Sequence, residues 1–135
     1  MTAQQCYRAA MLDIRRLGVT TRQNVKGCCR GCIAIDLDAE RGGAPILWHY
    51  GGQGNRYTWR DGVAVLAYRP AWLDKGEEVL DVLYLNHQGL TNPDTGKVND
   101  LGRAVVAAFT ANGLRVEWDG SETHCIEVVV GGGAE

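Results

Sequence analysis

Apolar residues recur at spacings of three and four positions in two segments of the chain, which is the pattern of one buried face of an α-helix. The first segment covers residues 3–17, with Thr2 as its expected N-cap and Gly18 at its expected end. The second covers residues 98–109 and is followed by Asn112-Gly113, a pair suited to a left-handed C-cap. The sequence therefore predicts one helix at the N-terminus and a second helix near the end of the chain.

Other segments are rich in β-branched and apolar residues, which favour strands. Residues 19–25 predict a short edge strand. Residues 32–50 predict a hairpin that turns at Arg41-Gly42-Gly43. Residues 78–86 carry a nearly continuous apolar run, which predicts a central strand covered on both faces.

Two further hairpins are predicted from Asp-Gly turns, because this dipeptide tolerates the positive φ angles of a tight type I′ turn. One covers residues 56–68 and turns at Asp61-Gly62, and the other covers residues 114–130 and turns at Asp119-Gly120. Together the elements predict an α+β fold. It is a mostly antiparallel sheet built from hairpins, with an N-terminal helix and a second helix before the last hairpin.

Length and composition are typical of one globular domain, with 135 residues, 45% of them hydrophobic and 22% charged. We expect this domain to span residues 1–130 and a flexible tail to follow at 131–135. A net charge of −2 without a basic run argues against nucleic acid as a partner. No apolar run approaches the roughly 18 residues of a membrane span, and the first residues do not resemble a signal peptide. We therefore expect a cytoplasmic protein that does not bind a membrane.

Three of the five cysteines lie within the segment Cys28-Cys29-Arg30-Gly31-Cys32. Cys29 and Cys32 have the C-x-x-C spacing of zinc ligands, and Cys28 adds a third thiol. Because zinc in a structural site takes four ligands, we add His49 as the candidate fourth. Single alternatives for that position are His87, His124, Cys125 and Cys6. The other interpretation is that no cofactor is bound and the thiols stay reduced in the core.

Redox or nucleophilic thiol chemistry requires a lowered thiol pKa, which a helix N-terminus or a nearby cation supplies. The residues after Cys32 are expected to form a strand, so only Arg30 offers a positive charge there. His49 could act as a base for Cys28 or Cys29, but a single structural hydrogen bond at a strand end is the simpler explanation. The sequence therefore leans away from an enzyme and assigns no catalytic residue.

Aromatic residues are concentrated between positions 48 and 72, and they include a candidate interaction surface of Tyr50, Tyr57, Trp59 and Trp72. Tyr and Trp are favoured at protein interfaces, but they are equally favoured in strands that pack into a core. The first hypothesis is a small cytoplasmic interaction or regulatory module that binds a protein partner. The alternative is a zinc-binding or thiol-dependent domain centred on the cysteine turn. An exposed edge at residues 19–25 would allow a homodimer as well as a monomer.

Several short motifs resemble a family of uncharacterised bacterial domains, mostly from actinobacteria, that is classed only as a domain of unknown function. Its members show a Gly-Ile/Val step after a helix, a Cys-Cys-x-x-Cys turn, a Leu-Tyr-Leu strand and a final Gly-Leu-x-Val-Glu-Trp-Asp-Gly segment. Here these correspond to Leu17-Gly18-Val19, to residues 28–32, to Leu83-Tyr84-Leu85 and to residues 113–120. The resemblance implies a shared fold and brings no known activity.

The chain departs from that family after His49. Members tend to continue with a His-Gln-Gln-Asp-Thr-Glu run, whereas this chain continues with Tyr50-Gly51-Gly52-Gln53-Gly54 and lacks the acidic pair. Any chemistry that the acidic residues perform in relatives is therefore expected to be lost. A small divergent member could equally be phage-encoded or bacterial.

Overall fold

The computed structural model describes residues 1–42, 44–52, 55–67, 78–88, 100–121 and 123–131. These residues form an α+β fold, as predicted. The elements in chain order are α1 Ala3–Arg16, β1 Thr20–Val25, α2 Arg30–Arg41, β2 Ile46–Tyr50, β3 Tyr57–Arg60, β4 Val63–Leu66, β5 Val82–Gln88, α3 Asp100–Ala111, β6 Val116–Glu117 and β7 Ile126–Val129.

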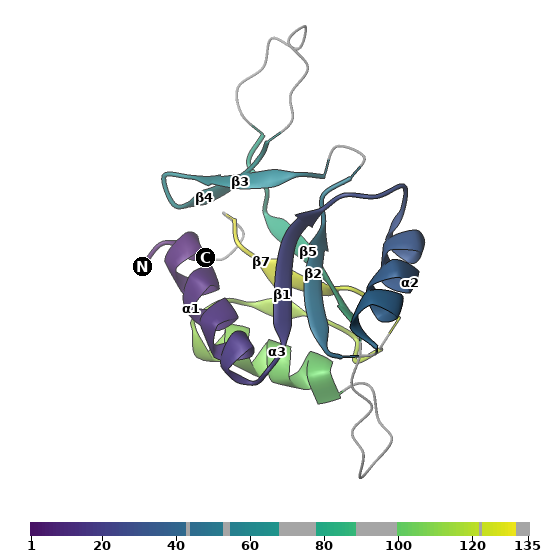
Figure 1. The fold of residues 1–135 in the computed structure, drawn as a ribbon. Helices are drawn as coiled ribbons and strands as arrows, with labels where there is room; N and C mark the ends of the chain where they lie inside the picture. Colours follow the sequence, from purple (N-terminus) through teal and green to yellow (C-terminus); the bar gives the residue numbers. More distant parts are fainter. Residues whose placement is uncertain (43, 53–54, 68–77, 89–99, 122, 132–135) are drawn as a thin grey trace, which may run out of the picture.

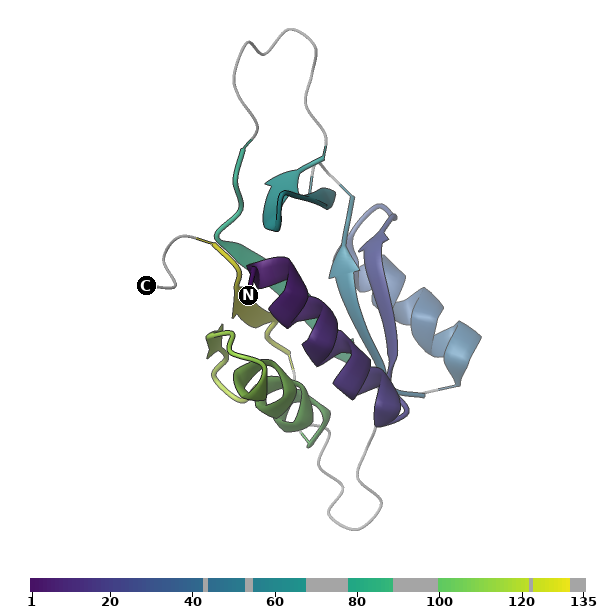
Figure 2. The ribbon, with the colours of Figure 1, turned by 90° about the vertical axis from the view of Figure 1, so that its left-hand side faces the viewer.

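Five strands form one sheet in the order β1-β2-β5-β7-β6, and β3 and β4 form a separate hairpin. Strand β1 is parallel to β2, and every other pair of neighbours is antiparallel. Helices α1 and α3 lie on one face of the sheet and α2 lies on the other (Figures 1 and 2). The main core fills the space between the sheet and helices α1 and α3. A smaller core lies between the other face of the sheet and α2.

Both helices expected from the three-and-four spacing are confirmed. Thr2 caps α1 through a reciprocal pair of hydrogen bonds with Gln5, and Gly18 after the helix has a φ of 88°. Helix α3 ends before Gly113, which has a φ of 87°. The hairpin at Asp61-Gly62 is confirmed as β3–β4, and both central residues of its turn have positive φ angles. Strands β6 and β7 also pair as a hairpin, but the predicted tight turn at Asp119-Gly120 is wrong, because residues 118–125 connect the two strands.

The hairpin predicted for residues 32–50 is wrong, because Arg30–Arg41 is helix α2. Ile33 and Leu37 are one helical turn apart, and both are buried against β2, whereas Ile35 between them is 71% exposed. Their alternation along the sequence therefore does not reflect two faces of a strand. Gly42, expected in a hairpin turn, is instead the left-handed C-cap of the helix, with a φ of 61°.

Helix α2 connects β1 to the parallel strand β2, so these three elements form a β-α-β unit. Strand β1 is an edge of the sheet, as predicted, and its register shifts between Arg22 and Val25. Asn24 lies in this irregularity with a φ of 53°. Its side-chain amide makes two hydrogen bonds with the backbone of Tyr57, at 2.8 and 2.9 Å, and so attaches the β3–β4 hairpin to the sheet.

Strand β5 is the middle strand of the sheet, but the prediction that both of its faces are covered is wrong. Leu83 and Leu85 are buried under α1 and α3, whereas Tyr84 on the opposite face is 54% exposed. Helix α2 covers only the β1–β2 side of that face (Figure 1). The remainder of the face is open, and it adjoins the candidate site.

Trp72 of the predicted interaction surface and residues 132–135 of the predicted tail lie outside the described residues. Position 68 of the predicted hairpin and positions 98–99 of the predicted second helix lie outside them as well. The backbone N–H of Gly131 donates to the carbonyl of Asp81 at 3.0 Å. In the described parts of the chain, none of the helices has the length and apolar character needed to cross a bilayer.

Candidate thiol and metal site

The cysteine segment connects β1 to α2, and its residues start the helix. Cys29 is the N-cap residue, with an extended backbone, and its thiol accepts a hydrogen bond from the backbone N–H of Cys32 at 3.4 Å. Cys28 precedes the cap, and Cys32 lies in the first helical turn. The C-x-x-C spacing thus places two thiols at the N-terminal end of α2, where the helix dipole is positive.

The three sulfur atoms of Cys28, Cys29 and Cys32 lie within 4.8 Å of one another, and all three residues are exposed. They form the only group of three potential metal ligands among the described residues. The prediction that these thiols lie close together is therefore confirmed. The alternative, in which they are buried in the core, is wrong. The cluster is open to solvent and close enough to hold one metal ion.

The thiols of Cys29 and Cys32, at the start of α2, have different pKa values. The backbone N–H of Cys32 is the main cause that lowers the pKa of Cys29 below its usual range. The pKa of Cys32 is raised to about 12, mainly by its hydrogen bond with Cys28 and then by that with Cys29. The expectation that no helix terminus lies at the cysteines was wrong, because α2 starts at Arg30.

Glycines hold the cysteine loop against the end of β2. The hydroxyl of Tyr50 donates to the carbonyl of Gly27 at 3.0 Å. A Cβ atom on Gly52 would lie 2.5 Å from that hydroxyl oxygen, and one on Gly27 would lie 2.5 Å from Cγ1 of Ile33. Side chains at these two positions would therefore push the loop away from the sheet. The residues before the cluster are fixed by packing that requires glycine.

His49 does not join the cysteine cluster. It is 6% exposed and lies edge-on against Tyr57, with 4.6 Å between ring centroids. Its Nδ1 atom is buried and has no hydrogen-bond partner. Burial lowers the pKa of His49 to about 4, so the imidazole is neutral at neutral pH. The geometry gives no support to His49 as the fourth ligand.

The other candidates for the fourth position also lie elsewhere. Cys6 packs against the main core from α1, and His124 is paired with Asp119. The thiol of Cys125 accepts a hydrogen bond from Nη1 of Arg30 at 3.0 Å. None of these residues shares a metal-ligand group with the three thiols among the described residues.

The residues of the predicted interaction surface are largely covered. Tyr50 and Tyr57 are buried, at 9% and 4% exposure, and Trp59 is half-buried against the main core. The hydroxyl of Tyr57 donates to Gln23, as does that of Tyr7. Packing within the fold accounts for these aromatic residues, and their contact with a partner stays a prediction.

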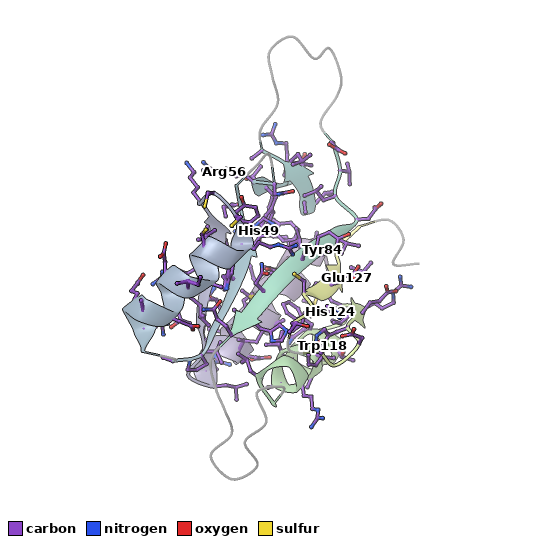
Figure 3. All side chains as sticks on the ribbon, turned by 90° about the vertical axis from the view of Figure 1, so that its right-hand side faces the viewer. His49, Arg56, Tyr84, Trp118, His124 and Glu127 are labelled. Atoms are coloured by element: carbon purple, nitrogen blue, oxygen red, sulfur yellow. The ribbon has the colours of Figure 1, made fainter. Side chains whose placement is uncertain are left out.

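The open part of the sheet face forms a cavity of about 780 Å³ between α2 and the β6–β7 hairpin. In Figure 3, α2 lies to the left of β5, which carries Tyr84, and Glu127, His124 and Trp118 follow on the other side of that strand. Arg30 extends from the first turn of α2 across this face to Cys125, whose thiol donates to Oδ1 of Asn86 at 3.3 Å.

The contact between Arg30 and Cys125 could not be predicted from the sequence, because the two residues are 95 positions apart. The neighbouring turn carries a second polar arrangement. Asp119 accepts from the backbone N–H of Ser121 at 2.8 Å, which is the main cause that lowers the Asp119 pKa, and it also pairs with His124. This pair is exposed on the rim of the cavity.

The comparisons with known proteins concern the second half of the chain. Residues 73–130 match the family model described as a domain of unknown function, DUF6891. The matched segment includes β5, α3, β6 and β7, together with Leu83-Tyr84-Leu85 and the 113–120 motif, but it does not include the cysteine cluster. Neither the curated proteins nor the solved structures contain a match. The second half of the chain is thus similar to an uncharacterised family.

Proposed function

We propose that the protein is a metal-binding domain that holds one zinc ion through the thiolates of Cys28, Cys29 and Cys32. The observation that carries this proposal is the position of three exposed sulfur atoms within 4.8 Å of one another at the start of α2. Zinc–thiolate bonds of about 2.3 Å in a tetrahedron place sulfur atoms about 3.8 Å apart. Small side-chain rotations therefore suffice to bind the ion.

The start of the helix favours the charged ligands that zinc requires. Thiolates are the metal-binding form of cysteine, and the N–H of Cys32 donates to the sulfur of Cys29. The positive end of the α2 dipole offsets part of the negative charge of three thiolates. The lowered pKa of Cys29 also favours nucleophilic chemistry of its thiolate, which is the thiol-dependent form of this proposal.

Three protein ligands leave a fourth position for a water molecule or a ligand from outside the chain. Zinc sites of this kind differ from structural sites, in which the protein supplies four ligands. Because the cysteines are exposed, that position faces solvent. Reduced thiols also require a reducing compartment, so a cytoplasmic location forms part of the proposal.

Cobalt substitution tests this function directly, because cobalt(II) takes the place of zinc and its visible bands report tetrahedral thiolate coordination. We expect one equivalent of cobalt to produce these bands and one equivalent of zinc to abolish them. Cys29→Ser and Cys32→Ser should lose the bands, whereas the matched controls Cys6→Ser and Cys125→Ser should keep them. Bands that survive in both cluster variants would contradict the assignment.

A protein-interaction function is a second candidate, and one observation favours it. Tyr84 is 54% exposed at the centre of the sheet face that α2 leaves open, beside the cavity of about 780 Å³. Aromatic side chains in such positions supply binding energy at interfaces. A photo-crosslinking residue at position 84 should capture one defined protein in the producing cells. The same photo-crosslinking residue in place of Leu12, which is 44% exposed on α1, should not capture that protein. Identical capture at both positions would contradict an interface on this face.

A further inference from the structure

The cysteine cluster has an arrangement that suits a reaction as well as metal binding. Cys29 and Cys32 form a C-x-x-C pair at the start of α2, and α2 is the helix of the β1-α2-β2 unit. A C-x-x-C pair beside a β-α-β unit is typical of redox-active dithiols, because the start of a helix favours negative charge on sulfur. The fold therefore places two thiols where thiol–disulfide exchange is chemically favourable.

The spacing of the thiols limits which disulfide can form within the cluster. Cys28 and Cys29 are adjacent in the sequence, and adjacent Cα atoms are about 3.8 Å apart across a trans peptide. Disulfides usually join Cα atoms that are about 4.4–6.8 Å apart, so a bond between Cys28 and Cys29 would be strained. Cys32 is therefore the thiol with which another can pair. Its backbone N–H donates to the sulfur of Cys29 at 3.4 Å, so these two residues already lie together over the first helical turn.

The sulfur atom of Cys29 is open to a reactant. All three cysteines of the cluster are exposed, and their sulfur atoms lie within 4.8 Å of one another. Position 31 is glycine, and a Cβ atom there would lie 4.0 Å from the sulfur of Cys29. A longer side chain at this position would shield that sulfur. Because the rate of thiol–disulfide exchange depends on access to the attacking sulfur, Gly31 favours the reaction.

The backbone on both sides of the cluster is held against the sheet. Before the cluster, the carbonyl of Gly27 accepts a hydrogen bond from the hydroxyl of Tyr50 at 3.0 Å. After it, Ile33 is 5% exposed and packs into the smaller core between α2 and the sheet. These contacts keep the thiols of Cys29 and Cys32 within reach of each other.

We propose that Cys29 and Cys32 form a dithiol that reduces low-molecular-weight organic disulfides. The Cys29 thiolate attacks one sulfur of the small disulfide, so a new S–S bond forms, the old S–S bond breaks and one small thiolate leaves. The Cys32 thiolate then attacks the Cys29 sulfur, forms the Cys29–Cys32 disulfide and displaces the second small thiolate. Two cysteines are oxidised and one disulfide is reduced to two thiols, which take up the two protons that the cysteines release. This activity rests on the thiol-dependent form of the proposed function and does not require a bound metal.

Mass spectrometry of the reduced, metal-free protein after incubation with glutathione disulfide tests this activity. We expect each chain to lose two hydrogen atoms and to release both halves of the probe as glutathione, with a Cys29–Cys32 disulfide in the peptide map. Cys28→Ser and the matched control Cys6→Ser should form the same disulfide. Glutathione distributed over the three cysteines of the cluster without an internal disulfide would overturn the proposal, and so would a cluster that reacts no faster than Cys6.

Two further variants assign the order of the steps. Cys32→Ser should trap the intermediate, so that one glutathione stays attached to Cys29 and no internal disulfide forms. Cys29→Ser should lose the internal disulfide, because the attacking sulfur is absent. An internal disulfide that forms in either variant as fast as in the wild type would contradict the assigned pair.

The zinc content of the reduced protein, measured separately, distinguishes this activity from the metal proposal. A protein that binds zinc but does not form the Cys29–Cys32 disulfide would overturn only the reduction of disulfides. A protein that forms this disulfide but binds no zinc would overturn only the metal proposal.

Discussion

The thiol of Cys29 accepts a hydrogen bond from the backbone N–H of Cys32, 3.4 Å away, so a sulfur atom caps the start of α2. Helix caps are usually oxygen atoms of Ser, Thr, Asp or Asn. A sulfur in this position gains most when it is a thiolate, because the N–H then faces a negative charge. The cap therefore links the start of a helix to the chemistry of the cysteine cluster.

We predict that the Cys29 thiol of the metal-free protein is more reactive than the Cys32 thiol. Its pKa is lowered, whereas the pKa of Cys32 is raised to about 12, so near neutral pH Cys29 carries more thiolate than Cys32. Iodoacetamide labelling across a pH series, followed by peptide mapping, measures this order. Alkylation of Cys29 should persist at lower pH than that of Cys32, and zinc should protect both. Preferential alkylation of Cys32 would contradict the assignment.

Helix α2 is the largest difference between the predicted and the observed fold, and it has a specific physical cause. Ile33, Ile35 and Leu37 alternate with other residues, which imitates a strand, although only Ile33 and Leu37 are buried. The N-cap is Cys29, which is not a usual start signal. Ala34, Ala39, Glu40 and Arg41 are good helix formers, and they were the signal that could have identified the helix.

The candidate site was predicted only where it is local in sequence. The cluster of Cys28, Cys29 and Cys32 follows from a spacing of a few residues, so it could be identified without a structure. The contact of Arg30 with Cys125 and the isolation of His49 depend on how distant segments pack. The parallel pairing of β1 with β2 depends on α2 as the connection between them, so a strand prediction for residues 32–41 excludes it.

Gly102 should not tolerate alanine, although alanine usually stabilises a helix by about 1 kcal/mol relative to glycine. A Cβ atom at this position of α3 would lie 2.7 Å from Cζ2 of Trp118. We expect Gly102→Ala to lower the free energy of unfolding by about 1–3 kcal/mol, as overpacked cores do. Urea denaturation measures the change. In a Trp118→Leu background the same substitution should be harmless or stabilising, and an equal loss there would contradict the steric explanation.

Both the side chain and the positive φ angle of Asn24 should contribute to the stability of the fold. Asn24→Gly keeps a residue that adopts a positive φ, but it removes both hydrogen bonds to the Tyr57 backbone. We expect a loss of roughly 1–3 kcal/mol in the free energy of unfolding. Asp61→Gly is the matched control, because Asp61 has a similar φ of 52° without such a pair of bonds among the described residues. Equal effects of both substitutions would argue against the attachment of the β3–β4 hairpin through Asn24.

His49 should make the fold sensitive to mild acid. Burial lowers its pKa to about 4 from an ordinary value of 6.5, so between these pH values the unfolded chain binds a proton that the folded chain excludes. The free energy of unfolding should therefore fall as the pH drops through this window, by roughly 3 kcal/mol in full. Urea denaturation at neutral pH and near the lower limit of the window should show a smaller loss for His49→Phe than for the wild type. Equal losses in the two proteins would refute this origin of acid sensitivity.

The central claim is that the three cysteines at the start of α2 bind one zinc ion. The most direct measurement is native mass spectrometry of the reduced protein after exchange into a zinc-containing buffer, with zinc quantified in parallel. We predict one zinc per chain in the wild type and none in Cys29→Ser or Cys32→Ser. A metal-free wild type with five free thiols would contradict the claim, and so would zinc that is retained when all three cysteines are replaced.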